Sequence, residues 1–177
     1  MALKEKALRR LADKLNAAGI PWAIGGSWLL CQKGISDTYH DFDIFVSAED
    51  APRADKVLTK LGMRSEATET GDFRAAYHFD GADIELNAWT SINNTWRVQF
   101  DAACVAEDVT VLGATVHLMH LEDWLVLYTL IGRAPKAEAI AAYLKEHGVQ
   151  HPERFAAVTP DPLPEGLQTT INQLLEG

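Results

Sequence analysis

Apolar residues recur along the chain with two different periods, which divide it into predicted helices and strands. Spacings of three and four residues predict amphipathic or apolar helices, and runs rich in β-branched and aromatic residues predict strands. The predicted helices are 3–18, 28–32, 51–61, 121–131, 137–147 and 167–175. The predicted strands are 20–24, 41–46, 73–79, 82–89, 96–100, 109–112 and 115–118.

The order of these elements predicts an α/β fold of the α+β type, with a small mixed β-sheet flanked by helices and a helical C-terminal extension. Asp80-Gly81 joins two of the strands, and a two-residue connection of this composition favours a type I′ turn. The length of 177 residues favours a single domain over 1–177. Within it, 1–118 would form the sheet-containing core and 119–177 the helical region.

Composition and charge narrow the classes of function. A hydrophobic content of 47% with 23% charged residues is typical of a soluble globular protein. The net charge of −9 disfavours duplex nucleic acid as a partner, because such a surface repels a phosphate backbone. No window approaches the ~18 apolar residues of a membrane span, and the charged start lacks the apolar run of a signal peptide. Cys31 and Cys104 match no metal-ligand spacing, so we expect free thiols and a cytoplasmic protein.

The first candidate for chemistry is Gly25-Gly26-Ser27, which lies between a predicted strand and a predicted helix. Two glycines allow a tight turn and a close approach of the backbone to a ligand, and Ser27 is placed to act as the helix N-cap. Free N–H groups at the start of a helix suit a phosphate. The alternative is an ordinary turn, because many such tripeptides bind nothing.

The second candidate is the pair Asp41 and Asp43 on an apolar strand. Alternate residues of a strand share a face, so both carboxylates project together while Phe42 and Ile44 enter the core. Two adjacent carboxylates repel each other, and a divalent cation such as Mg²⁺ removes that penalty. The alternative is the solvated face of an edge strand, although the apolar residues that follow indicate a buried strand.

The third candidate is the strand that carries Asp83, Glu85 and Asn87 on one face. If it lies beside the strand of Asp41 and Asp43, a third carboxylate completes an acidic cluster. Three such carboxylates would hold one or two Mg²⁺ ions and leave an oxygen free as general base toward a hydroxyl. The alternative is a half-exposed hairpin strand with its polar residues outward.

Together, these three features resemble the nucleotidyltransferase superfamily with a DNA polymerase β-like core. A Gly-Gly-Ser turn is followed after 13 residues by Asp-hydrophobic-Asp, and then by an acid between hydrophobic residues on a later strand. The resemblance covers about residues 20–90 and is strongest to small bacterial members: minimal nucleotidyltransferases, the lincosamide nucleotidyltransferase type and the abortive-infection toxin type. The segment 118–144 is similar to the helical region that follows the sheet in those proteins.

The resemblance implies transfer of a nucleoside monophosphate from an NTP, ATP first among them, to a hydroxyl of a small molecule or macromolecule, with release of pyrophosphate. It implies that Gly25, Gly26 and Ser27 bind the phosphates. Asp41, Asp43 and Glu85 would bind Mg²⁺ or Mn²⁺, and Asp83 is the other candidate for the third acid. We prefer Glu85 because apolar residues flank it on both sides. Small members often build the site across a dimer, so a homodimer is left open.

The chain departs from the family where positive charge is usual. Asp37 stands four residues before the acidic pair, and Tyr128 stands near the place of a helical lysine. The basic residues that could meet the triphosphate instead are Lys136, Arg133, Arg74 and Arg97. Two alternative functions follow: a catalytically inactive nucleotidyltransferase-like binding protein, or a toxin-type transferase that acts on RNA.

Overall fold

The computed structural model describes residues 2–65, 68–70 and 72–177. Its contacts divide the chain into two compact units. The first comprises the chain up to Thr90 together with Phe100–Met119, and the second comprises Ser91–Gln99 and His120–Gly177. The organisation of 1–177 as one domain stays a prediction.

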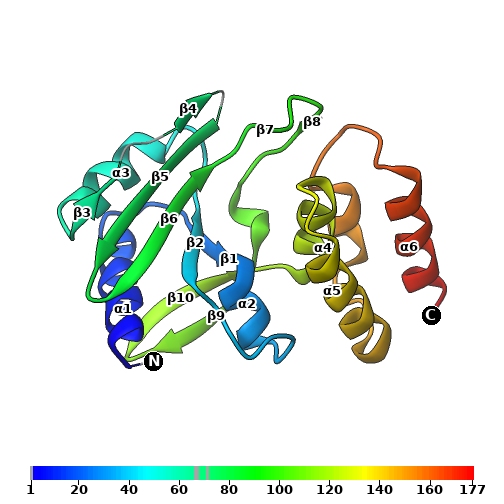
Figure 1. Cartoon of the computed structure of the whole chain (residues 1–177), viewed down its shortest axis with the longest axis horizontal. Coiled ribbons are helices and arrows are strands. Elements are labelled where there is room, and N and C mark those ends of the chain that lie inside the picture. The colour runs from blue at the N-terminus through cyan, green and yellow to red at the C-terminus, as the bar shows by residue number, and fades with distance from the viewer. Residues whose placement is uncertain (1, 66–67, 71) are drawn as a thin grey trace. The chain divides into compact units, whose positions relative to one another are not determined.

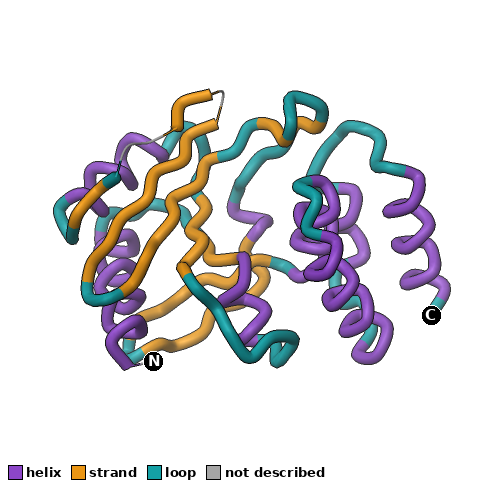
Figure 2. Tube along the Cα trace, in the orientation of Figure 1, coloured by secondary structure: helices purple, strands orange, loops and turns teal. Residues whose placement is uncertain are grey.

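The first unit is built on a mixed sheet (Figures 1 and 2). Its described strands are β1 (Ala23–Gly25), β2 (Asp41–Phe45), β3 (Met63–Arg64), β4 (Thr68–Thr70), β5 (Asp72–Phe79), β6 (Ala82–Ala88), β9 (Val105–Val111) and β10 (Ala114–Met119). The order across the sheet is β3-β5-β6-β2-β1-β10-β9, with β4 paired to β5. The predicted α/β fold with a small mixed sheet is confirmed.

Two strand pairs of the sheet are parallel, and both involve the short central strands. β2 runs parallel to β6, and β1 runs parallel to β10, whereas the other pairs are antiparallel. The β5–β6 hairpin pairs Phe79 with Ala82. Asp80 and Gly81 have φ values of 50° and 73°, which are the left-handed conformations that a type I′ turn requires. The predicted hairpin is therefore confirmed.

Three helices accompany this sheet: α1 (Ala2–Ala17), α2 (Gly26–Gln32) and α3 (Ala51–Thr59). α1 and α3 contact each other, and both contact β6, so they cover the same face of the sheet. On that face Tyr77 of β5 donates a hydrogen bond to Asp55 of α3. Alternation along a strand then places residues 74 and 76 of β5 on the opposite face.

The core between helices and sheet follows the predicted alternation. Phe42, Ile44, Ile84 and Leu86 are fully buried, whereas Asp41, Asp43 and Glu85 between them are half-buried. The apolar stripe of α1 is equally buried, at Ala7, Leu8, Leu11, Ala12 and Leu15. Burial of this size fixes the strand register, because a shift by one residue would turn every apolar side chain to the polar face.

The second unit is mainly helical. Its elements are β7 (Ser91–Ile92), β8 (Trp96–Arg97), α4 (Leu121–Leu130), α5 (Ala134–His147) and α6 (Glu165–Glu176), together with a 3₁₀ turn at Pro152–Ala156. Another 3₁₀ turn, Ala102–Cys104, belongs to the first unit. The second unit thus supplies the predicted helical C-terminal extension, and it also contains the short β7–β8 hairpin.

Buried charges hold the second unit together. Asp123 accepts hydrogen bonds from Arg154 at 2.8 and 2.7 Å, and the pair is almost wholly buried. Glu122 accepts hydrogen bonds from the backbone N–H groups of Gln150 and His151, both at 3.0 Å. The acidic residues that open α4 therefore act within the packing of this unit, where a buried charge requires a partner.

Several boundaries differ from the prediction. β9 is longer than the predicted strand 109–112. Of the predicted strand 96–100, only Trp96–Arg97 forms a paired strand. β3 and β4 were not predicted, because two or three residues are too few to show a period. Neither Cys31 nor Cys104 forms a disulfide bond, in line with the prediction. Among the described residues, no helix has the length and apolar character needed to cross a bilayer.

Candidate active site

The acidic residues meet because β2 and β6 are neighbours. The parallel register pairs Asp41 with Asp83 and Asp43 with Glu85. Paired residues of adjacent strands point to the same side of the sheet, so these carboxylates share one face. The predicted adjacency of the two acidic strands is confirmed.

Three of these carboxylates form a compact cluster. Oxygen atoms of Asp41, Asp43 and Glu85 all lie within 4.8 Å of one another, and each side chain is half-buried. Like charges at this separation repel strongly where water is partly excluded. Hard oxygen donors with an open solvent side suit a Mg²⁺ ion, which keeps several of its waters. The donor set therefore fits the divalent cation expected from the sequence.

Asp83 lies beside this cluster without being part of it. Its carboxylate is 2.7 Å from the Nδ1 atom of His78, which is its direct cross-strand neighbour. The Asp83 side chain is 72% exposed, compared with 24% for Glu85. Of the two candidates for the third acid, Glu85 is the one that lies within the cluster, and its role stays a prediction.

The choice between the two acids is open to a direct test. We expect Glu85→Gln to weaken Mn²⁺ binding by about tenfold, because it removes a charged ligand of the cluster. Asp83→Asn, which makes the same change in charge two residues away, should leave Mn²⁺ affinity within about twofold. Titration of Mn²⁺ followed by electron paramagnetic resonance measures both. A larger effect of Asp83→Asn than of Glu85→Gln would reverse the assignment.

The glycine turn lies directly against the cluster. Gly25 of β1 pairs with Asp43 of β2, and Gly26 follows with a φ of 61°. A β-carbon built on Gly26 would lie 1.8 Å from Oδ2 of Asp43 and 2.7 Å from its Cγ. Only glycine fits here, both for the left-handed backbone and for the space. The turn and the acidic pair are therefore one structural feature.

The predicted N-cap role of Ser27 is wrong. The helix begins at Gly26, with Gly25 as its N-cap residue, so Ser27 already lies inside the first turn. An N-cap residue precedes the first helical residue, so Ser27 could cap the helix only if the helix began at Trp28. The left-handed φ of Gly26 starts the helix earlier than that. Ser27 is buried next to this turn. Its backbone N–H still belongs to the first turn, where intrahelical acceptors are lacking.

Arg74 of β5 contacts the acidic cluster. Nη2 of Arg74 donates hydrogen bonds to both carboxylate oxygens of Glu85, at 2.8 and 2.7 Å. The bond to Glu85 is the largest cause that raises the pKa of Arg74, and the negative charges of Asp43 and Asp41 add to it. Arg74 was one of four candidate phosphate ligands in the sequence, but its pairing with Glu85 was not anticipated.

The other basic candidates lie in the second unit. Nζ of Lys136 is 5.2 Å from the ring centroid of Tyr128. Lys136, a candidate phosphate ligand, therefore contacts the tyrosine that stands near the place of the family's helical lysine. Arg97 pairs with Asp161 at 2.7 Å and thereby links β8 to the segment before α6. A role of Lys136 in phosphate binding stays a prediction.

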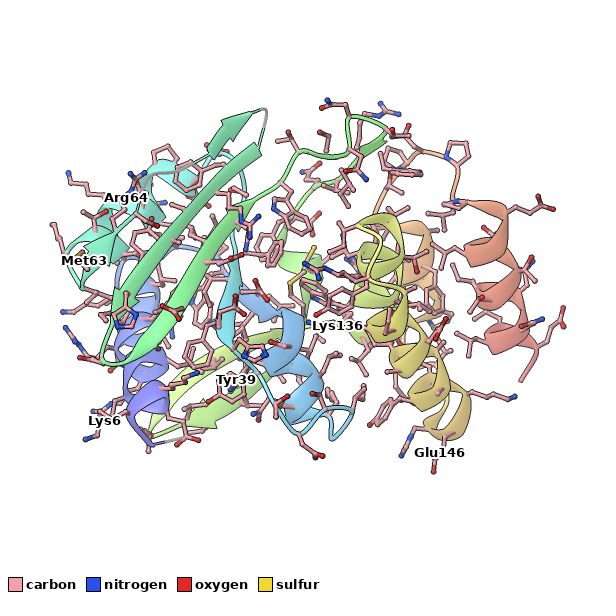
Figure 3. All side chains as sticks on the ribbon, viewed as in Figure 1. Lys6, Tyr39, Met63, Arg64, Lys136 and Glu146 are labelled. Carbon is pink, nitrogen blue, oxygen red and sulfur yellow. The ribbon has the colours of Figure 1, made fainter. Side chains whose placement is uncertain are left out.

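An open groove adjoins the acidic face. It has a volume of about 580 Å³, and Asp41, His78, Asp83 and Glu85 are among the residues that line it. Met63 and Arg64 of β3, labelled in Figure 3, also line it. Arg64 is held by Asp55 at 2.7 Å. Asp41 and Glu85 of the acidic cluster are therefore exposed to this groove.

A mixed sheet with two acidic residues on one strand, a third on its parallel neighbour and a Gly-Gly-Ser turn against them is the fold of the nucleotidyltransferase superfamily. Residues 2–132 match the family model described as uncharacterised nucleotidyltransferase. The chain belongs to this family of nucleotidyltransferases. No curated protein matches the chain in sequence.

Solved structures share the fold at low sequence identity. A Thermotoga maritima protein designated a nucleotidyltransferase (TM1012) is 22% identical, with a TM-score of 0.60 over 80% of this chain and 92% of its own. ANT(2″)-Ia in complex with adenylyl-2″-tobramycin is 12% identical, with a TM-score of 0.57 over 97% of both chains. A nucleotidyltransferase-like antigenic protein from Paracoccidioides brasiliensis is 16% identical, with a TM-score of 0.52 over 98% of this chain and 88% of its own. These similarities establish the fold.

Proposed function

We propose that the protein transfers a nucleoside monophosphate from a Mg²⁺-bound NTP, with ATP as the first candidate, to a hydroxyl of a small molecule. The observation that carries this proposal is the cluster of Asp41, Asp43 and Glu85, whose oxygens lie within 4.8 Å of one another against Gly26. Membership in a nucleotidyltransferase family supports the same reaction class. The small-molecule acceptor is favoured over nucleic acid by the net charge of −9.

Each residue of the site has a distinct role in this proposal. Asp41, Asp43 and Glu85 would hold the metal, and the backbone N–H groups of Gly26 and Ser27 would bind the phosphates. The bound Mg²⁺ would neutralise negative charge that develops on the reacting phosphate. The missing side chain of Gly26 leaves room for Asp43 and for the phosphates at the same turn.

The reaction needs a base as well as a binding site. The acceptor oxygen would form a bond to the α-phosphorus while the bond from that phosphorus to the bridging oxygen breaks and pyrophosphate leaves. A carboxylate oxygen of the cluster would take the hydroxyl proton. Asp41 and Glu85 both line the groove beside the cluster, and we assign the proton to Glu85, the third acid. An acceptor in that groove would approach the carboxylates from the side of β3, which is where we expect specificity to reside.

The proposal is tested by calorimetric titration with ATP, GTP, CTP and UTP, each with Mg²⁺ and again with excess chelator. We expect saturable binding of at least one nucleotide, weakened about tenfold or more without the metal, because the carboxylates alone repel a triphosphate. Binding that ignores the metal, or no binding by folded protein, would contradict the proposal.

A second measurement separates turnover from binding. Release of pyrophosphate from the nucleotide that binds would be followed in the presence of a panel of hydroxylated small molecules. We expect release with some acceptors and none without metal. Metal-dependent binding without release for any acceptor would favour the nucleotide-binding alternative over the enzyme.

A further inference from the structure

The strongest feature that the proposed reaction does not use is the position of Arg74. It lies on β5 directly opposite Asn87 of β6, one diagonal step from Glu85, and on the acidic face of the sheet. A single nitrogen, Nη2, bonds both oxygens of Glu85. The guanidinium therefore contacts both atoms through which Glu85 would bind a metal.

An ordinary surface ion pair is the alternative explanation. Such a pair contributes little, and Arg74 is 55% exposed. Its surroundings distinguish it from the other exposed pairs, however. The negative charges of Asp43 and Asp41 also raise the pKa of Arg74, and their oxygens lie within 4.8 Å of those of Glu85. Arg74 thus faces a cluster of three carboxylates, whereas an ordinary cross-strand ion pair involves only one.

We propose that Arg74 is the counter-ion of the acidic site. When the metal binds, Arg74 releases Glu85 and forms hydrogen bonds to a nucleotide phosphate instead. The proposal rests on the proposed function, because it takes the acidic cluster as the metal site. The guanidinium would offset the repulsion among the carboxylates wherever no metal is bound. A divalent cation at the cluster would then compete with Arg74 for the oxygens of Glu85.

The chemistry of the exchange favours phosphate as the second partner. A planar guanidinium binds phosphate oxygens with the same paired hydrogen bonds that it gives to a carboxylate. A metal that arrives with a triphosphate brings both the charge that displaces Arg74 and the anion that receives it. A metal that arrives alone must displace Arg74 without offering it a new partner. Arg74 would therefore couple metal loading to nucleotide binding.

This coupling predicts that one substitution at Arg74 raises the affinity for metal alone and lowers the affinity for metal with nucleotide. We expect Arg74→Gln to tighten binding of Mn²⁺ alone by about fivefold, the scale of one part-exposed ion pair. The same variant should bind Mn²⁺ with α,β-methylene-ATP about fivefold more weakly, because the phosphate loses a ligand. Electron paramagnetic resonance of Mn²⁺ measures the first affinity, and calorimetry measures the second.

Two variants make the test specific. Arg53→Gln, on α3, removes another exposed arginine that pairs with an aspartate, Asp50 at 2.8 Å, and makes the same change in net charge. It should alter neither affinity. Arg74→Lys keeps the charge without the planar fork and should fall between wild type and Arg74→Gln in both measurements. Circular dichroism and thermal unfolding verify that each variant is folded.

The outcomes separate this proposal from the proposed function. Equal Mn²⁺ affinities of wild type, Arg74→Gln and Arg53→Gln would overturn the exchange and leave the metal site in place. Weakening of both Mn²⁺ and Mn²⁺-nucleotide binding by Arg74→Gln would also overturn it, because a merely positioning arginine would act in that way. Absence of saturable Mn²⁺ binding in wild type and in Arg74→Gln alike would overturn the metal site itself.

Discussion

Asp41→Asn/Asp43→Asn is expected to lower the affinity for Mg²⁺-ATP by at least about 100-fold, to the level seen with chelator. The two substitutions remove two of three charged oxygen ligands from one face of β2, and neutral amides are poor substitutes for carboxylates around a hard divalent cation. Phe42 and Ile44, which hold the strand in the core, are unchanged. Binding should therefore be lost from a protein that is still folded.

The matched control for this variant is Asp13→Asn/Glu49→Gln, which makes the same change in net charge at two exposed positions of the first unit. Calorimetric titration of both double variants, with circular dichroism as the test of folding, gives the comparison. If the control lost as much affinity as Asp41→Asn/Asp43→Asn, the effect would be one of overall charge. If neither lost affinity, nucleotide would bind elsewhere on the chain.

The acidic cluster could be predicted from sequence because its parts are local. Alternation alone places Asp41 and Asp43 on one face and Phe42 and Ile44 on the other, and the structure has this arrangement. The prediction that Glu85 lies beside this pair needs information from outside the strand. Nothing within either strand says that β2 and β6 are neighbours, or that they run parallel in the register that pairs Asp43 with Glu85. That prediction came from the family resemblance, and the structure confirms it.

The contact of Arg74 with Glu85 was not predicted, although the Asp80-Gly81 turn carries the information needed to predict it. A two-residue turn at Asp80-Gly81 pairs Phe79 with Ala82, and the register of the whole hairpin follows from it. Counting back along that register places Arg74 opposite Asn87 and diagonal to Glu85, within reach of a long side chain. The missing step was to use the predicted turn to derive the pairs across the hairpin.

Other features lack any local signal. β3 has two residues, both exposed, so its sequence carries no burial pattern. The segment Ser91–Gln99 belongs with the helical unit because of contacts far along the chain, such as Arg97 with Asp161. The contact of Lys136 with Tyr128 depends on the turn between α4 and α5. Long-range pairings of this kind are set by tertiary packing, which outweighs local preference.

Gly26→Ala is expected to lower the affinity for Mg²⁺-ATP by about 10- to 100-fold, the cost of displacing a group that orients a metal ligand. The added methyl group would lie 1.8 Å from Oδ2 of Asp43, far inside contact distance. Asp43 must therefore turn away from Asp41 and Glu85, or the glycine turn must move away from β2. Either movement separates the phosphate-binding backbone from the metal-binding carboxylate.

Gly19→Ala separates this effect from backbone strain. Gly19 has a φ of 64°, close to the 61° of Gly26, but a methyl group there meets no atom within 4 Å. Gly19→Ala should cost about 1–2 kcal/mol of stability in urea unfolding, because it places alanine in a left-handed conformation. Gly26→Ala should cost at least as much, because its methyl group also meets Asp43. Only Gly26→Ala should lose nucleotide affinity. Equal affinities of the two variants would mean that the contact between Gly26 and Asp43 has no part in binding, and that the glycine serves the turn alone.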